Sequence, residues 1–282
     1  MSRAEAAVGA APPELFFILG AISQYLGAAV AVGLFDELPP GTVALVRVLA
    51  AAAIIVLLRR SWRRTWTRSD VAWTAAFGIS LAAMNTSIYF AIEQLPLGNA
   101  VAIEFLGPIT VAAIGSRTLR SAASLVVASI GVITLAGVQA EGTLSGVGFA
   151  LLAGAFWAGY IVLGHRVATQ GVAIDGLGVG MLIGALVISP VGIGGLSDGF
   201  GAPWLLVLAL STGLLSNVIP YGIDQVVMPR LTRARFAFLQ SLLPVTATVV
   251  GLVSLGQEPS GRELLGIALV ILAIAARGGE RD

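Results

Sequence analysis

The sequence contains no cysteine and no lysine, and its one histidine is His165. The lack of cysteine excludes disulfides, thiolate metal sites and a cysteine nucleophile, and a single histidine argues against a histidine-based metal site. Charge is scarce as well. Only 11% of the 282 residues are charged, whereas an average soluble domain has about 25%. The net charge of +1 argues against a nucleic acid as partner.

Apolar residues make up most of the chain: 57% are hydrophobic, and the mean hydropathy is +0.95. A soluble fold cannot hide that much apolar surface, so the composition predicts an all-α integral membrane protein. A spanning helix needs about 20 mostly apolar residues. By that measure we expect ten transmembrane helices, at residues 15–35, 40–58, 71–92, 97–115, 121–139, 144–164, 174–194, 204–227, 234–255 and 262–277.

The positions of the arginines test this count. If the N-terminus lies in the cytoplasm and the helices alternate in direction, fourteen of the sixteen arginines fall in cytoplasmic segments. Of the other two, Arg262 falls in an outer link and Arg47 lies within a span. Basic residues are enriched on the cytoplasmic side of membrane proteins. We therefore expect a multi-pass protein of the cell (plasma) membrane with both termini in the cytoplasm.

The chain resembles itself when it is shifted by 136 residues. "EFLGPITVAA" (104–113) then falls on "QSLLPVTATV" (240–249), and Ser80 falls on Ser216. Each half has five predicted spans, and because five is odd the second half enters the membrane in the opposite orientation. The sequence thus predicts two inverted five-helix repeats, residues 1–140 and 141–282. Inverted halves with a binding site at their interface are a transporter architecture.

Three classes of function compete. A secondary transporter, most readily an exporter that works by alternating access, fits the repeat and the charges inside spans. No GxxxxGK[ST] loop is present to use ATP, which leaves protons as a possible coupling ion. An intramembrane enzyme would need motifs such as HExxH or GxSxG, and both are missing. A passive channel or facilitator stays open. The expected partners are the lipid bilayer and a small-molecule substrate, with no cofactor, and the oligomeric state is left open.

Local stretches narrow the class of transporter. "GISLAAMNTSIYFAIEQLPLGNAVAIEFLGP" (78–108), "GAFWAGYIVLGHR" (154–166) and "LSNVIPYGIDQ" (215–225) resemble the threonine/homoserine exporter branch of the drug/metabolite transporter superfamily, of the EamA type. The resemblance implies export of small amphipathic metabolites, amino acids among them. That branch usually has a glutamate just before the proline of the ninth span, where this chain has Leu243. Export of amines, nucleosides or drugs therefore remains an alternative.

Two charged residues lie inside predicted spans. At a rise of about 1.5 Å per residue, Glu104 lies about 10 Å and Arg47 about 9 Å below the outer face, and Asn85 has a similar depth. Intramembrane ionisable residues are functional candidates by default. Glu104 either faces a central cavity, where it binds a cationic group or a proton, or forms a structural pair with Arg47. Arg47 either extends outward as an interfacial anchor or counter-ion, or holds a substrate carboxylate.

A second, neutral layer, of Asn217, Tyr221 and Gln240, is expected nearer the inner face. The amides of both layers can equally bond between helices, and the aromatic rings can simply pack. At the inner end of the eighth span, Asp224 is expected to be solvated or to form a salt bridge near Arg230. The resulting substrate-binding or proton-coupling candidates are Glu104, Arg47, Asn85, Gln24, Tyr25, Trp157, Tyr160, Asn217, Tyr221 and Gln240.

Prolines mark places where spans can bend, because proline removes a backbone donor. Pro108, which follows Gly107, and Pro244 occupy equivalent positions in the two halves, and Pro220 lies in the eighth span. We expect these residues to kink or gate the helices, with a static kink as the alternative.

Overall fold

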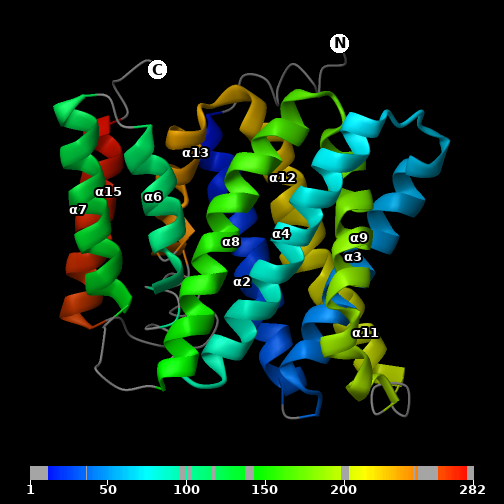
Figure 1. Cartoon of the computed structure of the whole chain (residues 1–282). Coiled ribbons are helices and arrows are strands. Elements are labelled where there is room, and N and C mark those ends of the chain that lie inside the picture. Colours follow the sequence, from blue (N-terminus) through cyan, green and yellow to red (C-terminus); the bar gives the residue numbers. More distant parts are fainter. Residues whose placement is uncertain are drawn as a thin grey trace.

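The computed structural model describes residues 12–35, 37–95, 100, 103–115, 118–136, 143–197, 203–243, 245–246 and 260–277, and regular structure among them is helical (Figure 1). The α-helices are α2 (Pro13–Phe35), α3 (Pro40–Arg59), α4 (Arg68–Ile92), α6 (Leu106–Ile114), α7 (Leu119–Ala136), α8 (Leu144–Thr169), α9 (Ala173–Gly192), α11 (Pro203–Gly213), α12 (Ile219–Val227), α13 (Arg233–Leu239) and α15 (Gly261–Arg277). Short 3-10 turns are η1 (Ser61–Arg63), η2 (Ile193–Gly195) and η4 (Met228–Arg230), and η3 (Leu214–Val218) is a π-helical turn.

These helices coincide with the ten predicted segments wherever the chain is described, so the all-helical membrane fold is confirmed. Two segments are interrupted. The fourth has a turn at Phe105 before α6 begins, and the eighth consists of α11, η3 and α12 in succession. The ninth is described only as far as residue 246. By length and apolar composition, α3, α4, α8 and α9 with η2 are each able to cross a membrane.

The start of α2 and the end of α15 lie at the same end of the bundle, the upper end in Figure 1. We call this the terminal end and the opposite one the distal end. The arginine-rich link between α3 and α4 lies at the terminal end as well (Figure 1). This arrangement agrees with termini and basic links on one side of the membrane. Which side that is stays a prediction.

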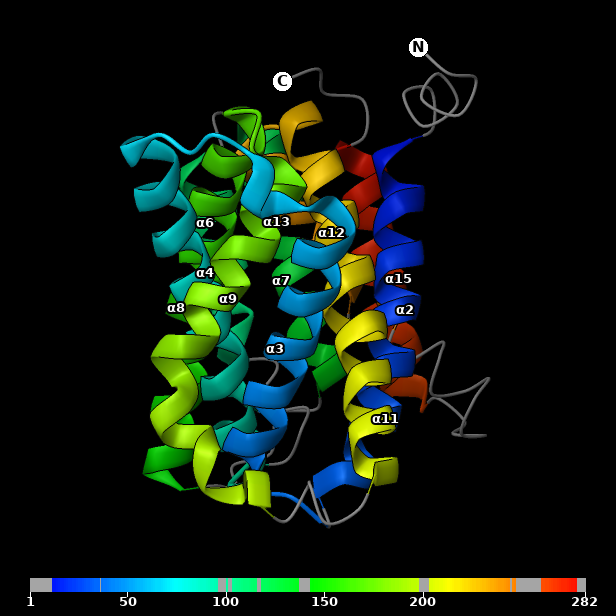
Figure 2. The same ribbon diagram turned by 90° about the vertical axis from the view of Figure 1, so that its right-hand side faces the viewer.

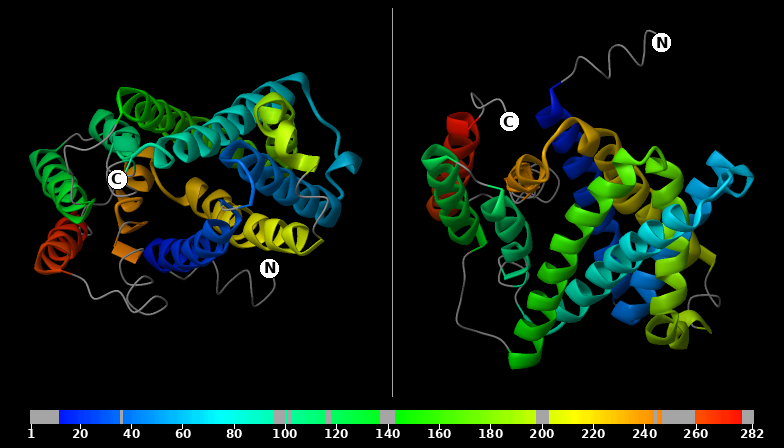
Figure 3. Two further views of the ribbon diagram at one scale, coloured as in Figure 1. Left: turned by 90° about the horizontal axis from the view of Figure 1, so that it is seen from below. Right: turned by 45° about the horizontal axis from the view of Figure 1, so that its top comes forward.

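Helices from the two predicted halves pack directly on one another. α4 lies against α8 and α9, and α3 lies against α9 (Figures 1 and 2). Glycine permits this approach: a Cβ atom on Gly78 of α4 would overlap the backbone of Gly180 on α9. At one edge of the bundle, α7 and α15 form a pair (Figure 3). Small residues at such crossings are typical of helix packing in membranes.

The outer surface of the bundle is apolar. Leu58, Leu186 and Leu272 are 78%, 65% and 63% exposed. Large aromatic side chains such as Phe77, Tyr160 and Phe236 are instead fully buried. A bundle with an apolar exterior suits a lipid environment, and its polar residues must find partners inside.

Candidate transport site

Arg47 of α3 lies at the centre of a buried polar network and is only 6% exposed. Its Nε donates to Asn217 Oδ1 at 2.9 Å and its Nη2 to Asn85 Oδ1 at 2.8 Å, while Nη1 donates to the Tyr89 hydroxyl. The guanidinium also lies over the Tyr89 ring, 5.2 Å from its centroid. All three acceptors are neutral, so the network orients the positive charge without cancelling it.

This geometry corrects two expectations. Arg47 is not an interfacial anchor, because its side chain points into the bundle. Nor does it pair with Glu104: within the described residues, the ion pairs all involve Asp175, with Arg59 and with Arg64. Depth could not decide the direction, since a long side chain at this depth can extend either way. Acceptors inside the bundle decide it, because they replace the hydrogen bonds that water would supply.

Asn217 reaches Arg47 from the π-helical turn η3. Pro220 follows directly in α12 and has no backbone N–H, so it cannot donate to the carbonyl of Ser216 four residues earlier. That missing bond relaxes the helical register at this turn. π-turns within helices frequently occur at functional sites, and this one directs a buried amide at the guanidinium.

Glu104 lies just before the turn at Phe105 and is 8% exposed. Because Pro108 has no N–H, the Glu104 carbonyl lacks its usual helical partner. Gly154 of α8 lies against this carbonyl, and a Cβ on Gly154 would be 2.7 Å from the oxygen. A Cβ on Gly107 would in turn overlap the Gly154 carbonyl. The close crossing of α6 and α8 therefore fixes the position of Glu104.

The Glu104 side chain has no salt-bridge partner in the part of the chain that the structure describes. A buried charge without a partner is costly, so such a carboxyl group either holds a proton or awaits a cation. Both states match what the sequence suggests for a carboxylate that faces a transport pathway.

Tyr221 belongs to the arginine network and lies near Glu104. The Tyr221 hydroxyl accepts a hydrogen bond from Asn85 Nδ2 at 3.3 Å. Tyr221 also lies close enough to Arg47 and Glu104 to feel their charges, and Tyr25 lies close enough to Glu104. Five of the predicted site residues therefore lie in one neighbourhood, although they come from five separate parts of the chain.

The two expected layers are not separate. Asn217 and Tyr221 accept hydrogen bonds from Arg47 and Asn85, which were expected in the outer layer. Gln240 is buried at the end of α13. No hydrogen bond among the described residues joins its side chain to Arg47 or Glu104.

Sequence reasoning missed two members of this cluster. Tyr89 was not considered, because an aromatic residue near a helix end reads as an interface anchor. Asp224 was expected to be solvated or to form a salt bridge near Arg230. It is half-buried instead, and the Tyr160 hydroxyl donates to its Oδ2 at 2.6 Å. No salt bridge involves Asp224 in the described ranges.

The other predicted residues lie around this centre or beyond it. The Trp157 ring meets the Phe105 ring edge-on, with centroids 5.9 Å apart, next to Glu104. Gln24 of α2 is in contact with η3, because its carbonyl accepts a hydrogen bond from Ser216 Oγ at 3.2 Å. Pro244 lies outside the described residues.

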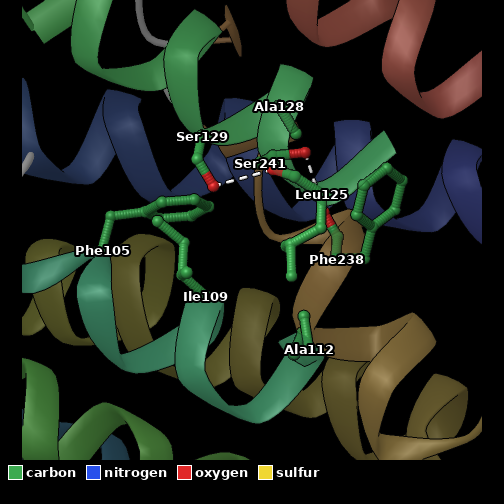
Figure 4. Close-up of a pocket in the computed structure, with 9 residues that line it drawn as sticks. Phe105, Ile109, Ala112, Leu125, Ala128, Ser129, Phe238 and Ser241 are labelled. Atoms are coloured by element: carbon green, nitrogen blue, oxygen red, sulfur yellow. Dashed lines mark hydrogen bonds between the residues drawn. The ribbon is translucent and has the colours of Figure 1, made fainter. Parts of the chain in front are cut away.

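A crevice between α6, α7 and α13 borders the site on the far side of Phe105 (Figure 4). Its lining is apolar apart from Ser129 and Ser241, whose hydroxyls donate to the carbonyls of Leu125 and Phe238, a few residues earlier in the chain. It leaves no room for a water molecule, so it does not offer a place for a polar cargo. No group of His, Asp and Glu side chains in the described residues is arranged to hold a metal ion.

Known proteins resemble this chain along nearly its whole length. The threonine/homoserine exporter RhtA of Salmonella typhimurium (strain LT2) is 33% identical over 266 residues, which cover 93% of this chain and 89% of that protein. RhtA of Escherichia coli (strain K12) is 32% identical over equal shares. One solved crystal structure, 19% identical, has a TM-score of 0.73 over 98% of this chain and 96% of its own, which shows a shared fold.

Residues 144–276 match the family model described as the EamA-like transporter family. The relatives are named as exporters, as the stretches around Glu104 and Asn217 suggest. Apolar helices of spanning length fit the same assignment. The chain is a multi-pass membrane protein and belongs to the EamA-like transporter family.

Proposed function

We propose that this protein is a secondary transporter that exports small amino acids, of the size and polarity of threonine and homoserine, across the plasma membrane. The observation that carries the proposal is its likeness to proteins named as threonine/homoserine exporters over 93% of its length. Both termini lie in the cytoplasm, so the terminal end of the bundle is the cytoplasmic end. This orientation follows from the arginines of the α3–α4 link.

Glu104 and Arg47 divide the recognition of the cargo between them. An amino acid carries an ammonium and a carboxylate group. Glu104 is buried without a described cationic partner, so it binds the ammonium group, or a proton when the cargo is absent. Arg47 is held by neutral acceptors and still carries its charge, so it attracts the carboxylate. A zwitterion would neutralise the charges of Glu104 and Arg47 at the same time, so neither charge would stay buried without a counter-ion.

Transport proceeds by alternating access between the two halves. The halves are two inverted five-helix repeats, residues 1–140 and 141–282, and their similarity lets them exchange conformations. The glycine contacts between α4 and α9 permit sliding without large side chains in the way. Pro108 and Pro220 mark where α6 and α12 can change their bend.

A passive facilitator, or an exporter of amines, nucleosides or drugs, remains the alternative. Leu243 favours the second of these, since a glutamate is usual at that place in the threonine/homoserine branch.

Counterflow in proteoliposomes tests the proposal. Vesicles loaded with unlabelled L-threonine should accumulate labelled L-threonine from outside transiently, and the initial rate should saturate. A channel gives no counterflow, because its pore does not carry a site from one side to the other. Counterflow with an amine or a nucleoside but not with threonine or homoserine would replace the proposed cargo.

A further inference from the structure

Asp224 is a carboxylate that the proposed site does not use. It lies on α12 and is half-buried. At a rise of about 1.5 Å per residue, it is only about 5 Å from the end of that helix at Val227, near the terminal end of the bundle. Glu104, counted back from Ile114 by the same rise, lies about 15 Å from that end. The two carboxylates therefore differ in depth.

The surroundings of Asp224 leave it able to bind a cation. The Tyr160 hydroxyl donates to Oδ2, while Oδ1 accepts no hydrogen bond from the described residues. The described residues also provide no arginine or histidine within salt-bridge distance. A carboxylate that is oriented by one donor, and has a second oxygen free, is suited to accept a hydrogen bond from an ammonium group.

Tyr160 joins Asp224 to the rest of the site. It is fully buried, and its ring stacks on Phe77 with centroids 5.5 Å apart. The ring also lies 5.4 Å from the ring of Tyr221, measured between centroids, and Tyr221 is near both Asp224 and Glu104. Side chains in contact thus run from Asp224 near the terminal end through Tyr160 to Tyr221, in the neighbourhood of Glu104. The aromatic rings among them can also attract a cation.

We propose that Asp224 and Tyr160 form a second binding station for the ammonium group of the cargo, on the cytoplasmic side of Glu104. The proposal rests on the export of an amino acid as the function. Two carboxylates at different depths let the ammonium group move in two short steps, with Tyr221 between them, and so avoid one long passage through an apolar interior. The station at Asp224 receives cargo from the cytoplasm, and Glu104 delivers it to the outer side.

Kinetics measured from each side of the membrane test this assignment. In Asp224→Asn the amide keeps an acceptor for Tyr160 but loses the charge. The KM for L-threonine entering from the cytoplasmic side should rise about tenfold, a loss of about 1.4 kcal/mol, whereas the KM from the outer side should stay within about twofold. Tyr160→Phe should likewise raise the KM from the cytoplasmic side and leave the KM from the outer side unchanged. The control is Asp70→Asn, which removes an exposed carboxylate at the start of α4, also at the terminal end.

Unchanged KM values from both sides in Asp224→Asn would overturn the proposal. So would an equal rise on both sides, because that would show a general structural effect. Failure of the wild type to transport threonine and homoserine would instead refute the proposed function. In that case the binding station at Asp224 can still be tested without transport, by labelling an introduced cysteine, because the described residues contain no native cysteine.

That test compares Tyr160→Cys with Tyr160→Cys/Asp224→Asn. A cationic methanethiosulfonate reagent added from the cytoplasmic side should react faster than an anionic one of similar size, and the ratio of the two rates should fall when Asp224 loses its charge. A ratio that is the same in both variants would show that Asp224 does not attract cations. No reaction from the cytoplasmic side would show that no pathway reaches it, and either result would refute the station.

Discussion

Asn85 donates to the Tyr221 hydroxyl at 3.3 Å, and these two residues are 136 positions apart in the chain. That is the same offset that aligns the first half of the sequence with the second. In two halves related by a pseudo-two-fold axis, equivalent positions can touch each other only close to the axis. The contact is therefore what an inverted repeat predicts, and it would put the axis through the network of Arg47 and Tyr221.

Tyr221→Phe should damage transport more than folding. Asn85 Nδ2 keeps its bond to the Leu81 carbonyl at 2.9 Å, so the loss of one interhelical hydrogen bond should cost only about 0.6 kcal/mol of stability. The melting temperature in detergent should change little, while the rate of threonine counterflow should fall about tenfold or more. Counterflow at the wild-type rate would show that Tyr221 does not connect the two charged residues.

Gly107→Ala should displace Glu104 and destabilise the protein. The new Cβ overlaps the backbone carbonyl of Gly154, which cannot turn away as a side chain could. Overpacking of this kind costs about 1–3 kcal/mol, and the melting temperature should fall accordingly. Gly148→Ala on α8 is the matched control, because its Cβ would meet nothing within 4 Å. If both variants melt at the wild-type temperature, the crossing of α6 and α8 is not tight.

Asp175→Ala should destabilise the protein more than Asp175→Asn. Asp175 is 8% exposed and accepts a hydrogen bond from the buried Ser61 hydroxyl at 2.7 Å. Alanine leaves that hydroxyl unpaired, at a cost of about 1–3 kcal/mol. Asparagine can keep the bond and loses only the pairs with Arg59 and Arg64, whose side chains are 55% and 36% exposed, so about 0–1 kcal/mol is expected. Equal melting temperatures for the two variants would contradict this account.

Cysteine labelling tests the orientation, and the absence of native cysteine makes each probe specific. Ser197→Cys, at the distal end, should react with a membrane-impermeant maleimide in intact cells. Thr65→Cys, an exposed position in the arginine-rich link, should react only after the membrane is opened. The opposite pattern would mean that the terminal end faces outward.

Hydropathy and arginine spacing were sufficient to predict the helices, because both reflect the chemistry of the bilayer directly. Depth placed Arg47 and Asn85 together but put Asn217 in a separate inner layer, so the bond between Arg47 and Asn217 was not predicted. That bond depends on the π-helical turn η3, which the sequence shows only through Pro220. A helical register shift of one residue is decided by packing, and α2 packs closely on this turn.

Asp224 shows a different limit of sequence reasoning. From its place near a helix end, Asp224 was expected to be solvated or to form a salt bridge near Arg230. Its partner is Tyr160, 64 residues away. Which face of α12 meets α8 cannot be deduced from a span that is apolar on most sides. For the same reason the sequence did not predict the packing of the Glu104 carbonyl, which lies against Gly154 of another helix.

Glu104→Gln tests the central claim most directly. The amide has nearly the size of the carboxyl group, but it can neither carry a proton nor hold a cation by charge. Glu93→Gln is the matched control, because Glu93 is exposed at the end of α4. Glu104→Gln should reach the membrane and melt near the wild-type temperature, with threonine counterflow reduced about 100-fold or more, whereas Glu93→Gln should transport normally. Wild-type counterflow by Glu104→Gln would show that this carboxylate does not bind the cargo or a proton.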